Sequence, residues 1–162
     1  MPPARVVTIG VYGFTVARFL EGLREARVDT LLDVRQRRGV RGSEYAWANA
    51  KRLQGALADA GIAYRHLKEL APTTEMREAQ YAVDAAKGEG KRTRTQLSDE
   101  YKRAYIRSIL DPADLGALLA GLDESDTAAL MCVESDARAC HRGLIAERLA
   151  ADYGVIVEHI TP

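Results

Sequence analysis

The sequence predicts a single-domain α/β protein with a mostly parallel, doubly wound (Rossmann-like) five-stranded sheet and a helical insertion. Short apolar runs alternate with stretches of helical periodicity along the chain, which is the pattern of repeated strand–helix units. The runs are apolar throughout, as expected of strands that helices cover on both faces. At 162 residues the chain has the length of one domain, so residues 1–162 are expected to share one core.

Five apolar runs are predicted to be strands. The first is rich in β-branched residues and stops at Gly10, and the second stops at Asp33 and Val34. The expected strands are residues 6–10, 30–34, 62–67, 128–133 and 155–160. If they are parallel, their carboxyl ends meet at one edge of the sheet, which is where ligands bind in open α/β folds.

Helical periodicity fills the segments between the strands. Thr15, Ser43 and Asp111 stand where helix-capping side chains belong, and Gly61 and Gly154 stand where two helices should end. The expected helices are residues 16–26, 44–60, 75–86, 97–110, 112–122 and 141–152. Because residues 75–122 show helical patterns and no strand, we interpret them as an insertion able to cover a site.

Composition and charge exclude several classes of protein. No apolar run approaches the roughly 20 residues of a membrane helix, and no secretory signal is visible at the N-terminus. Two cysteines are too few for a disulfide scaffold, so we expect a cytoplasmic protein with no membrane partner. The sequence indicates no particular cofactor and no oligomeric state.

The formal net charge is zero, but the positive charge is concentrated in two short loops. Residues 35–42 hold four arginines and no acid, and residues 87–94 hold four Lys or Arg residues against one glutamate. Crowded cations repel one another unless an anion lies among them, so the loops predict an anionic small molecule or a nucleic acid as partner. Solvated surface loops are the alternative interpretation.

Chemically active residue types gather at the predicted edge of the sheet. The fourth strand ends at Cys132-Val133-Glu134, and the next helix begins at Cys140-His141-Arg142. The free N–H groups and the dipole at that helix start favour an anion, and they favour a thiolate at Cys140. We predict Asp33, Glu134, Cys140 and His141 as catalytic candidates, and Gly10, Tyr12, Arg35, Arg38, Glu69, Cys132 and Arg142 as ligand-binding candidates.

Two sharper motifs are present but weak. Cys132 and Arg138 have the C-x5-R spacing of a phosphatase or rhodanese-type anion loop, but the residues between them include two acids and no glycine. Cys132, Glu134, Cys140 and His141 are all metal-ligand types, yet their spacing matches no recognised zinc motif. We therefore predict no metal site, although the residue types make metal binding worth testing. A disulfide between the two cysteines is not expected to persist in a cytoplasm.

Five short motifs follow one another along nearly the whole chain. They are Thr8-Ile9-Gly10, Asp33-Val34-Arg35, His66-Leu67-Lys68-Glu69-Leu70, Cys132-Val133-Glu134 and Cys140-His141-Arg142. This series resembles the DUF 488 family, a domain of unknown function, and its last two motifs are the most specific. The resemblance implies a compact, single-domain α/β fold with its site at the same edge, and it implies no established activity. The chain departs from it at residues 11–13, where many members have His-Ser, and at Ala137, where many have proline.

Three functions follow as hypotheses. The first is a small enzyme that binds a phosphate-bearing or other anionic ligand at the strand edge. The second is a nucleic-acid-associated module whose basic loops follow the phosphates. The third is a protein–protein adaptor without chemistry. The second hypothesis would use Arg37, Arg38, Arg41, Lys91, Arg92 and Arg94.

Overall fold

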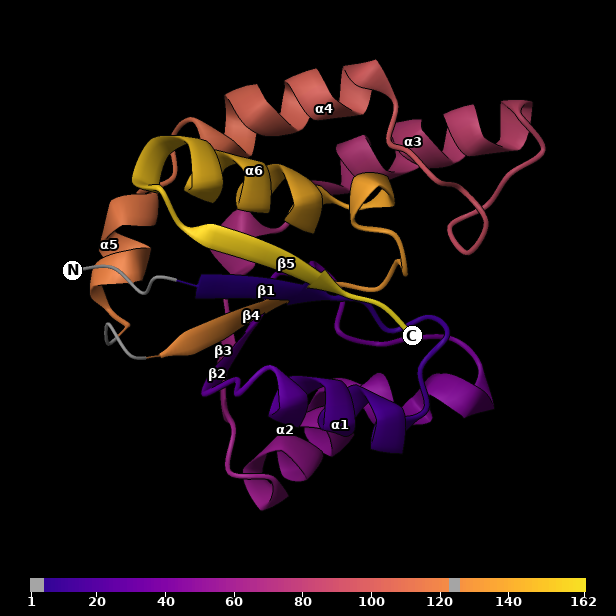
Figure 1. Ribbon diagram of the computed structural model, residues 1–162. Coiled ribbons are helices and arrows are strands. Elements are labelled where there is room, and N and C mark those ends of the chain that lie inside the picture. The colour runs from indigo at the N-terminus through magenta and orange to yellow at the C-terminus, as the bar shows by residue number, and fades with distance from the viewer. Residues whose placement is uncertain (1–4, 123–125) are drawn as a thin grey trace.

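The computed structural model describes residues 5–122 and 126–162, and it has three layers (Figure 1). The middle layer is a sheet of β1 (Arg5–Ile9), β2 (Thr30–Asp33), β3 (Ala63–His66), β4 (Thr127–Met131) and β5 (Ile156–Ile160). The strand order is β3-β2-β4-β1-β5, and every neighbouring pair is parallel. The parallel α/β fold expected from the sequence is therefore confirmed.

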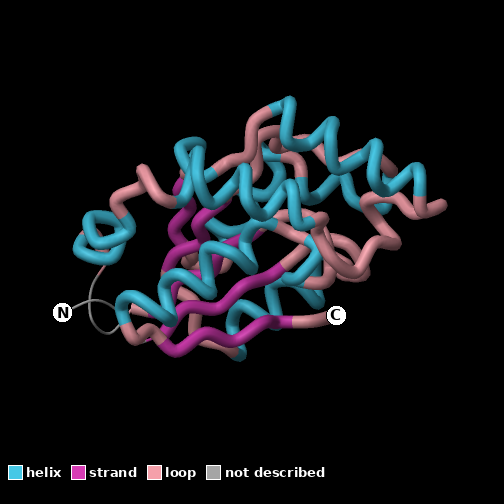
Figure 2. Tube along the Cα trace, turned by 90° about the horizontal axis from the view of Figure 1, so that it is seen from above, coloured by secondary structure: helices cyan, strands magenta, loops and turns pink. Residues whose placement is uncertain are grey.

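Helices cover both faces of the sheet. α1 (Val16–Glu25) and α2 (Ala50–Asp59) cover one face, and α3 (Thr74–Ala86), α4 (Asp99–Tyr105) and α6 (His141–Tyr153) lie on the other (Figure 1). α5 (Leu115–Ala120) lies near the end of the sheet where the strands begin. Seen from above, loops gather at the opposite end, towards the C-terminus (Figure 2). None of the described helices is long and apolar enough to cross a membrane.

The core follows the apolar pattern of the sequence. Every residue of the central strand β4 is buried, whereas the edge strands β3 and β5 are partly exposed. On α1 the apolar side chains of Phe19 and Leu23 face the core, and Phe19 packs against Trp47 with ring centroids 4.9 Å apart. Thr15 caps α1 by accepting a hydrogen bond from the Arg18 N–H, as predicted.

The carboxyl ends of the strands are level with one another, which is what creates a shared edge. Ile9 of β1 is the register partner of both Met131 of β4 and Ile160 of β5. Asp33 of β2 is the partner of Met131 and of His66 of β3. The loops that leave these five residues therefore start side by side, although they are far apart in the sequence.

The helix predicted for residues 44–60 is wrong in its first third. A 3-10 helix occupies Ser43–Ala48, the chain extends at Asn49, and α2 begins only at Ala50. Two contacts explain the break. The Ala48 carbonyl accepts a hydrogen bond from Arg35, and the Asn49 side chain accepts one from the Val40 N–H. The interruption therefore anchors the first basic loop to the sheet.

Two further predicted helices also differ in their bounds. The helix expected at 97–110 begins after Ser98, whose hydroxyl accepts from the Tyr101 N–H, and it continues from α4 into a π-helical turn over Ile106–Leu110. The helix expected at 112–122 is shorter, because Asp114 and not Asp111 caps it. The N-terminal residues 1–4, on which the expectation of no secretory signal partly rests, lie outside the described residues.

Candidate functional site

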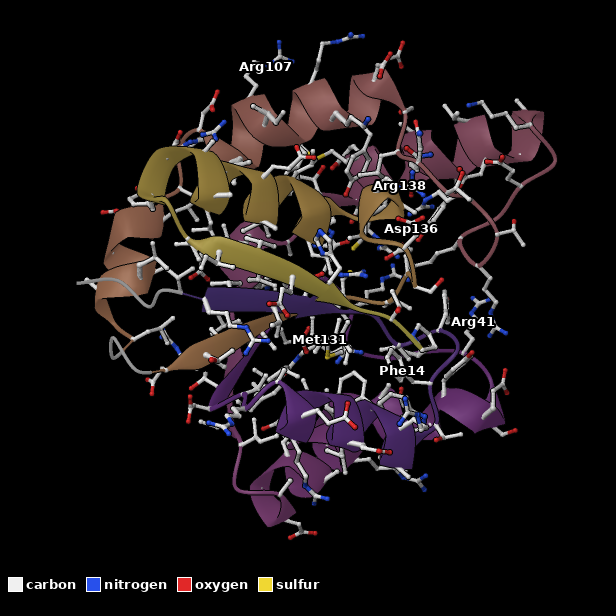
Figure 3. All side chains as sticks on the ribbon, in the orientation of Figure 1. Phe14, Arg41, Arg107, Met131, Asp136 and Arg138 are labelled. Carbon is white, nitrogen blue, oxygen red and sulfur yellow. The ribbon has the colours of Figure 1, made fainter. Side chains whose placement is uncertain are left out.

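A pocket of about 730 Å³ opens at the carboxyl edge of the sheet. Its lining combines the turn after β4, the first basic loop, and the α3–α4 segment of the insertion, which contributes Arg77, Lys91 and Tyr101. In Figure 3, Arg41, Asp136 and Arg138 mark this side of the molecule beyond the strand arrowheads, whereas Arg107 projects from the outer helical layer. The volume lies within the range of small-molecule sites.

Cys132, Cys140 and His141 meet at the floor of this pocket. The His141 Nδ1 atom lies 3.8 Å from the Cys132 sulfur and 3.7 Å from the Cys140 sulfur. The other ring nitrogen, Nε2, lies 2.7 Å from the Val34 carbonyl oxygen at the end of β2. Since a carbonyl only accepts, Nε2 carries a proton and donates it, and this bond fixes the plane of the imidazole. Asp33, Arg35 and His141 thus share one edge, as predicted from the topology.

The two cysteines differ in acidity. Burial by itself would raise the pKa of the Cys140 thiol, but the Cys132 thiol, His141 and Arg142 stabilise the thiolate and hold its pKa well below the usual value. Burial raises the pKa of Cys132 well above its usual value, and the neighbouring Cys140 charge adds to that shift. Although burial disfavours a charged imidazole, the Cys140 thiolate raises the pKa of His141. The floor is therefore suited to a thiolate at Cys140 and a thiol at Cys132.

Glu134 lines the pocket beside Cys140 and His141, and Arg94 holds its carboxylate in place. The Arg94 guanidinium donates to Glu134 at 2.7 Å, to Asp84 of α3 at 2.8 Å and to the Ala139 carbonyl at 3.1 Å. All three charged side chains are at least nine-tenths buried. The second carboxylate oxygen of Glu134 has no hydrogen-bond partner among the described residues. Burial raises the pKa of Glu134, and the Cys140 charge adds to the shift.

The upper lining is strongly cationic. Among the described lining residues there are seven Lys or Arg side chains and one carboxylate, that of Glu134. Four of the cations have no ion-pair partner among the residues that the structure describes: Arg37, Arg41, Arg77 and Lys91. Arg77 donates only to the neutral groups of Gln36 and Tyr81. These unpaired charges leave a positive potential above the floor.

Asp33 and Arg35 form a buried ion pair at the edge of the pocket, and Arg35 is one of the lining residues. Arg35 donates to both Asp33 oxygens at 2.9 Å and to the Ala48 carbonyl at 2.9 Å. Tyr64 donates to the same carboxylate at 2.6 Å. Both charged side chains are almost fully buried, although Arg35 also lines the pocket. The pair shapes the edge, and the catalytic role of Asp33 and the anion-binding role of Arg35 stay predictions.

Arg142 and Gly10 both hold the loop after β4 in place, and neither of them lines the pocket. Arg142 is fully buried and donates to the Glu134 carbonyl at 2.6 Å, the Ser135 carbonyl at 3.3 Å and the Thr8 hydroxyl at 3.2 Å. It therefore holds the loop that carries the floor residues. A side chain at Gly10 would overlap the Glu134 carbonyl, so only glycine lets β1 and this loop approach so closely. Both residues position the site without lining the pocket.

The remaining predicted residues are dispersed. Tyr12 lines the pocket and lies under the Arg92 guanidinium, 5.0 Å from its ring centre. Arg38 reaches the Tyr64 hydroxyl at 3.4 Å, beside the pocket. Glu69 is exposed and lines a separate cavity, which also contains Leu115 of α5. The structure thus leaves Glu69 apart and brings six of the predicted residues together in the pocket: Tyr12, Arg35, Cys132, Glu134, Cys140 and His141.

Sequence reasoning missed the parts of the site that the insertion supplies. Arg77 and Tyr81 stand one turn apart on α3, and Arg94 is the last residue of the second basic loop. The basic loops were noticed as an anion signal, but the pairing of Arg94 with Asp84 and Glu134 joins residues up to 50 positions apart, and no local pattern announces it. The weakly amphipathic α3 carries a buried polar pair, Gln80 and Asp84, which was the available sign of a polar interior.

Comparison with known proteins supports the family and nothing finer. Searches of curated proteins and of solved structures found no match for the chain. A family model described as domain of unknown function DUF488 matches residues 15–149, which include the floor of the pocket and the whole insertion. Because that match spans most of the 162 residues, this chain belongs to the DUF488 family.

Proposed function

We propose that the protein is a small enzyme that binds an anionic, phosphate-bearing small molecule in this pocket, with its chemistry at Cys140 and His141. The observation that carries the proposal is the set of unpaired cations above a floor of reactive groups. A phosphate among Arg37, Arg41, Arg77 and Lys91 would gain charge-assisted hydrogen bonds without breaking an existing ion pair. The pocket volume accommodates a ligand of nucleotide size.

Cys140, His141 and Glu134 each have a distinct chemical role in this proposal. The Cys140 thiolate is the nucleophilic group, and His141 lies against it with Nδ1 pointing at its sulfur. Glu134 offers a carboxylate oxygen without a hydrogen-bond partner among the described residues, so it is the acid/base candidate. Asp33, which the sequence suggested for that role, lies in the buried ion pair with Arg35 and is not needed for it.

Loss of a single unpaired cation should weaken anion binding. Lys91→Met and Arg77→Met are each expected to lower the affinity for pyrophosphate about 10- to 100-fold, the worth of one charge-assisted hydrogen bond. Arg107→Met removes the same charge from an exposed helix position outside the pocket, and it should leave the affinity unchanged. Isothermal titration of pyrophosphate into the three variants and the parent chain measures the difference. Equal affinity in Lys91→Met and Arg107→Met would refute the proposed pocket.

The nucleic-acid alternative is less well supported by the contacts. It needs basic side chains free to follow a phosphate backbone, but Arg94 is buried in two ion pairs and Arg92 pairs with Glu44. Of the cations without an ion-pair partner among the described residues, Arg37, Arg41, Arg77 and Lys91 all line the pocket. A gel-shift titration with single- and double-stranded oligonucleotides at several salt concentrations tests this alternative, because phosphate tracking weakens steeply with salt. The adaptor hypothesis predicts that the parent chain does not bind pyrophosphate in the isothermal titration described above.

A further inference from the structure

We propose that Cys132, Cys140 and His141 form a zinc site, with both sulfurs and the histidine Nδ1 as ligands and a fourth coordination position open to the pocket. The three ligand atoms come from two elements: Cys132 follows β4, and Cys140 and His141 open α6. They lie within 4.8 Å of one another in a buried cluster. The sequence spacing alone did not predict this site, because a strand–loop–helix turn and not a zinc-finger loop brings the ligands together.

The two sulfur–nitrogen distances are close to two edges of a tetrahedron around zinc. Zn–S bonds of about 2.3 Å and Zn–N bonds of about 2.0–2.1 Å place a sulfur and a nitrogen about 3.5–3.6 Å apart in tetrahedral geometry. The two sulfur–Nδ1 distances are 3.8 and 3.7 Å. Both pairs therefore need to close by only about 0.2 Å to coordinate the ion.

The orientation of the His141 ring is also fixed in the way that is usual for a zinc ligand. Its Nε2 proton is donated to the Val34 carbonyl at 2.7 Å, which leaves the Nδ1 lone pair directed at the two sulfurs once the Nδ1 proton is displaced. Zinc-bound histidines usually donate their second ring nitrogen to a carbonyl or carboxylate in this way, and that bond fixes the ring. Tyr105 packs against the ring, with centroids 5.4 Å apart, and limits its rotation further.

Charge and access agree with an open site. Two thiolates neutralise one Zn²⁺ ion, and the Arg94 guanidinium beside them is already paired with two carboxylates. Cys132, Cys140, His141 and Glu134 all line the same pocket, so a ligand entering the pocket can reach the ion. Zinc held by two cysteines and one histidine, with the fourth place free, is an arrangement of catalytic zinc sites. The unpartnered oxygen of Glu134 is available to hydrogen-bond whatever fills that place.

The zinc site rests on the proposed function only for the use of the fourth position. When zinc is bound, Cys140 would be a ligand, so its proposed role as nucleophile applies to the metal-free chain, and zinc would supply Lewis-acid activation at the fourth position. Zinc binding itself requires no substrate, so it can be tested without pyrophosphate. If the chain binds zinc but not pyrophosphate, the zinc site is supported and the proposed anion pocket is refuted. If it binds pyrophosphate but not zinc, the anion pocket is supported and the zinc site is refuted.

The test uses the reduced full-length chain and zinc chloride. We expect one zinc per chain by elemental analysis after dialysis, and a binding heat that changes with the buffer because coordination releases protons. Cys140→Ser and Cys132→Ser should each weaken zinc binding by more than about 100-fold, since each removes a ligand and not merely its support. His159→Gln is the matched control, because His159 contacts Thr8 instead of the floor, and it should bind zinc normally.

Cobalt substitution keeps the proposal falsifiable if a cysteine variant fails to fold. Cobalt bound by the parent chain should show thiolate charge-transfer absorption and the intense visible bands of tetrahedral coordination. Circular dichroism shows which variants are folded. The proposal is overturned if the folded Cys140→Ser variant binds zinc as tightly as the parent chain. It is also overturned if the cobalt spectrum of the parent chain lacks the thiolate bands.

Discussion

Replacing Arg94 with methionine is expected to lower the free energy of unfolding by about 3–5 kcal/mol, the usual loss when one partner of a buried ion pair is removed. Arg94 joins three segments: Asp84 on α3, Glu134 in the loop after β4, and the Ala139 carbonyl. Without the guanidinium, Asp84 and Glu134 stay buried and lose the cation that is hydrogen-bonded to both. The insertion would then lose its principal polar link to the sheet edge.

Urea unfolding followed by circular dichroism measures this loss. Arg138→Met is the matched control, because Arg138 also forms an ion pair, with Asp136, but its side chain is largely exposed. We expect that substitution to leave the free energy of unfolding nearly unchanged, since exposed ion pairs contribute little. Similar urea midpoints for the two variants would show that Arg94 does not hold the insertion in place.

The second large effect is the difference in reactivity between the two cysteines. In the metal-free chain, alkylation of Cys140 by iodoacetamide should proceed at pH values where an ordinary thiol is protonated and inert. The reason is the lowered pKa of Cys140, which burial opposes and the Cys132 thiol and His141 together produce. Because the thiolate is the reacting form, the rate should be constant above that lowered pKa and fall as the pH drops through it. Cys132, whose pKa burial raises, should react only at much higher pH.

Peptide mapping by mass spectrometry separates the two reactions within one sample. Cys132→Ala removes the hydrogen bond to the Cys140 sulfur, so the Cys140 profile should shift towards higher pH in that variant. The urea-unfolded chain is the control, and there both cysteines should follow the same profile. If the folded chain also shows coincident profiles for the two cysteines, the floor does not stabilise a thiolate.

The sheet could be predicted from the sequence because its signals are local. Each strand is an apolar run with a turn residue or a polar residue at its end, and parallel pairing then placed residues such as Asp33 and His141 on one edge. The capping of α1 by Thr15 and the end of α6 at Gly154, which adopts φ 66°, are local in the same sense. For these features the neighbouring residues carry the information.

The state of each charged residue at the edge could not be predicted, because it depends on contacts made over long distances in sequence. Arg35 was expected to bind an anion, but it also forms a buried ion pair with Asp33 and donates to the Ala48 carbonyl, which faces it once the chain breaks at Asn49. Arg142 similarly has loop carbonyls as partners. Among the described lining residues, the unpaired cations Arg77 and Lys91 belong to the insertion, whose packing over the pocket follows from no local motif. The other two, Arg37 and Arg41, belong to the first basic loop.

If the proposed function is right, the cations of the insertion and the Cys140 thiolate belong to one site, and a ligand at the cations shields the thiolate. The most direct measurement is the rate of Cys140 alkylation in the metal-free chain with increasing pyrophosphate. We predict that pyrophosphate slows alkylation to a saturable limit in the parent chain and in Arg107→Met, and that Lys91→Met requires about 10- to 100-fold more pyrophosphate for the same protection. An alkylation rate that does not respond to pyrophosphate would contradict the claim.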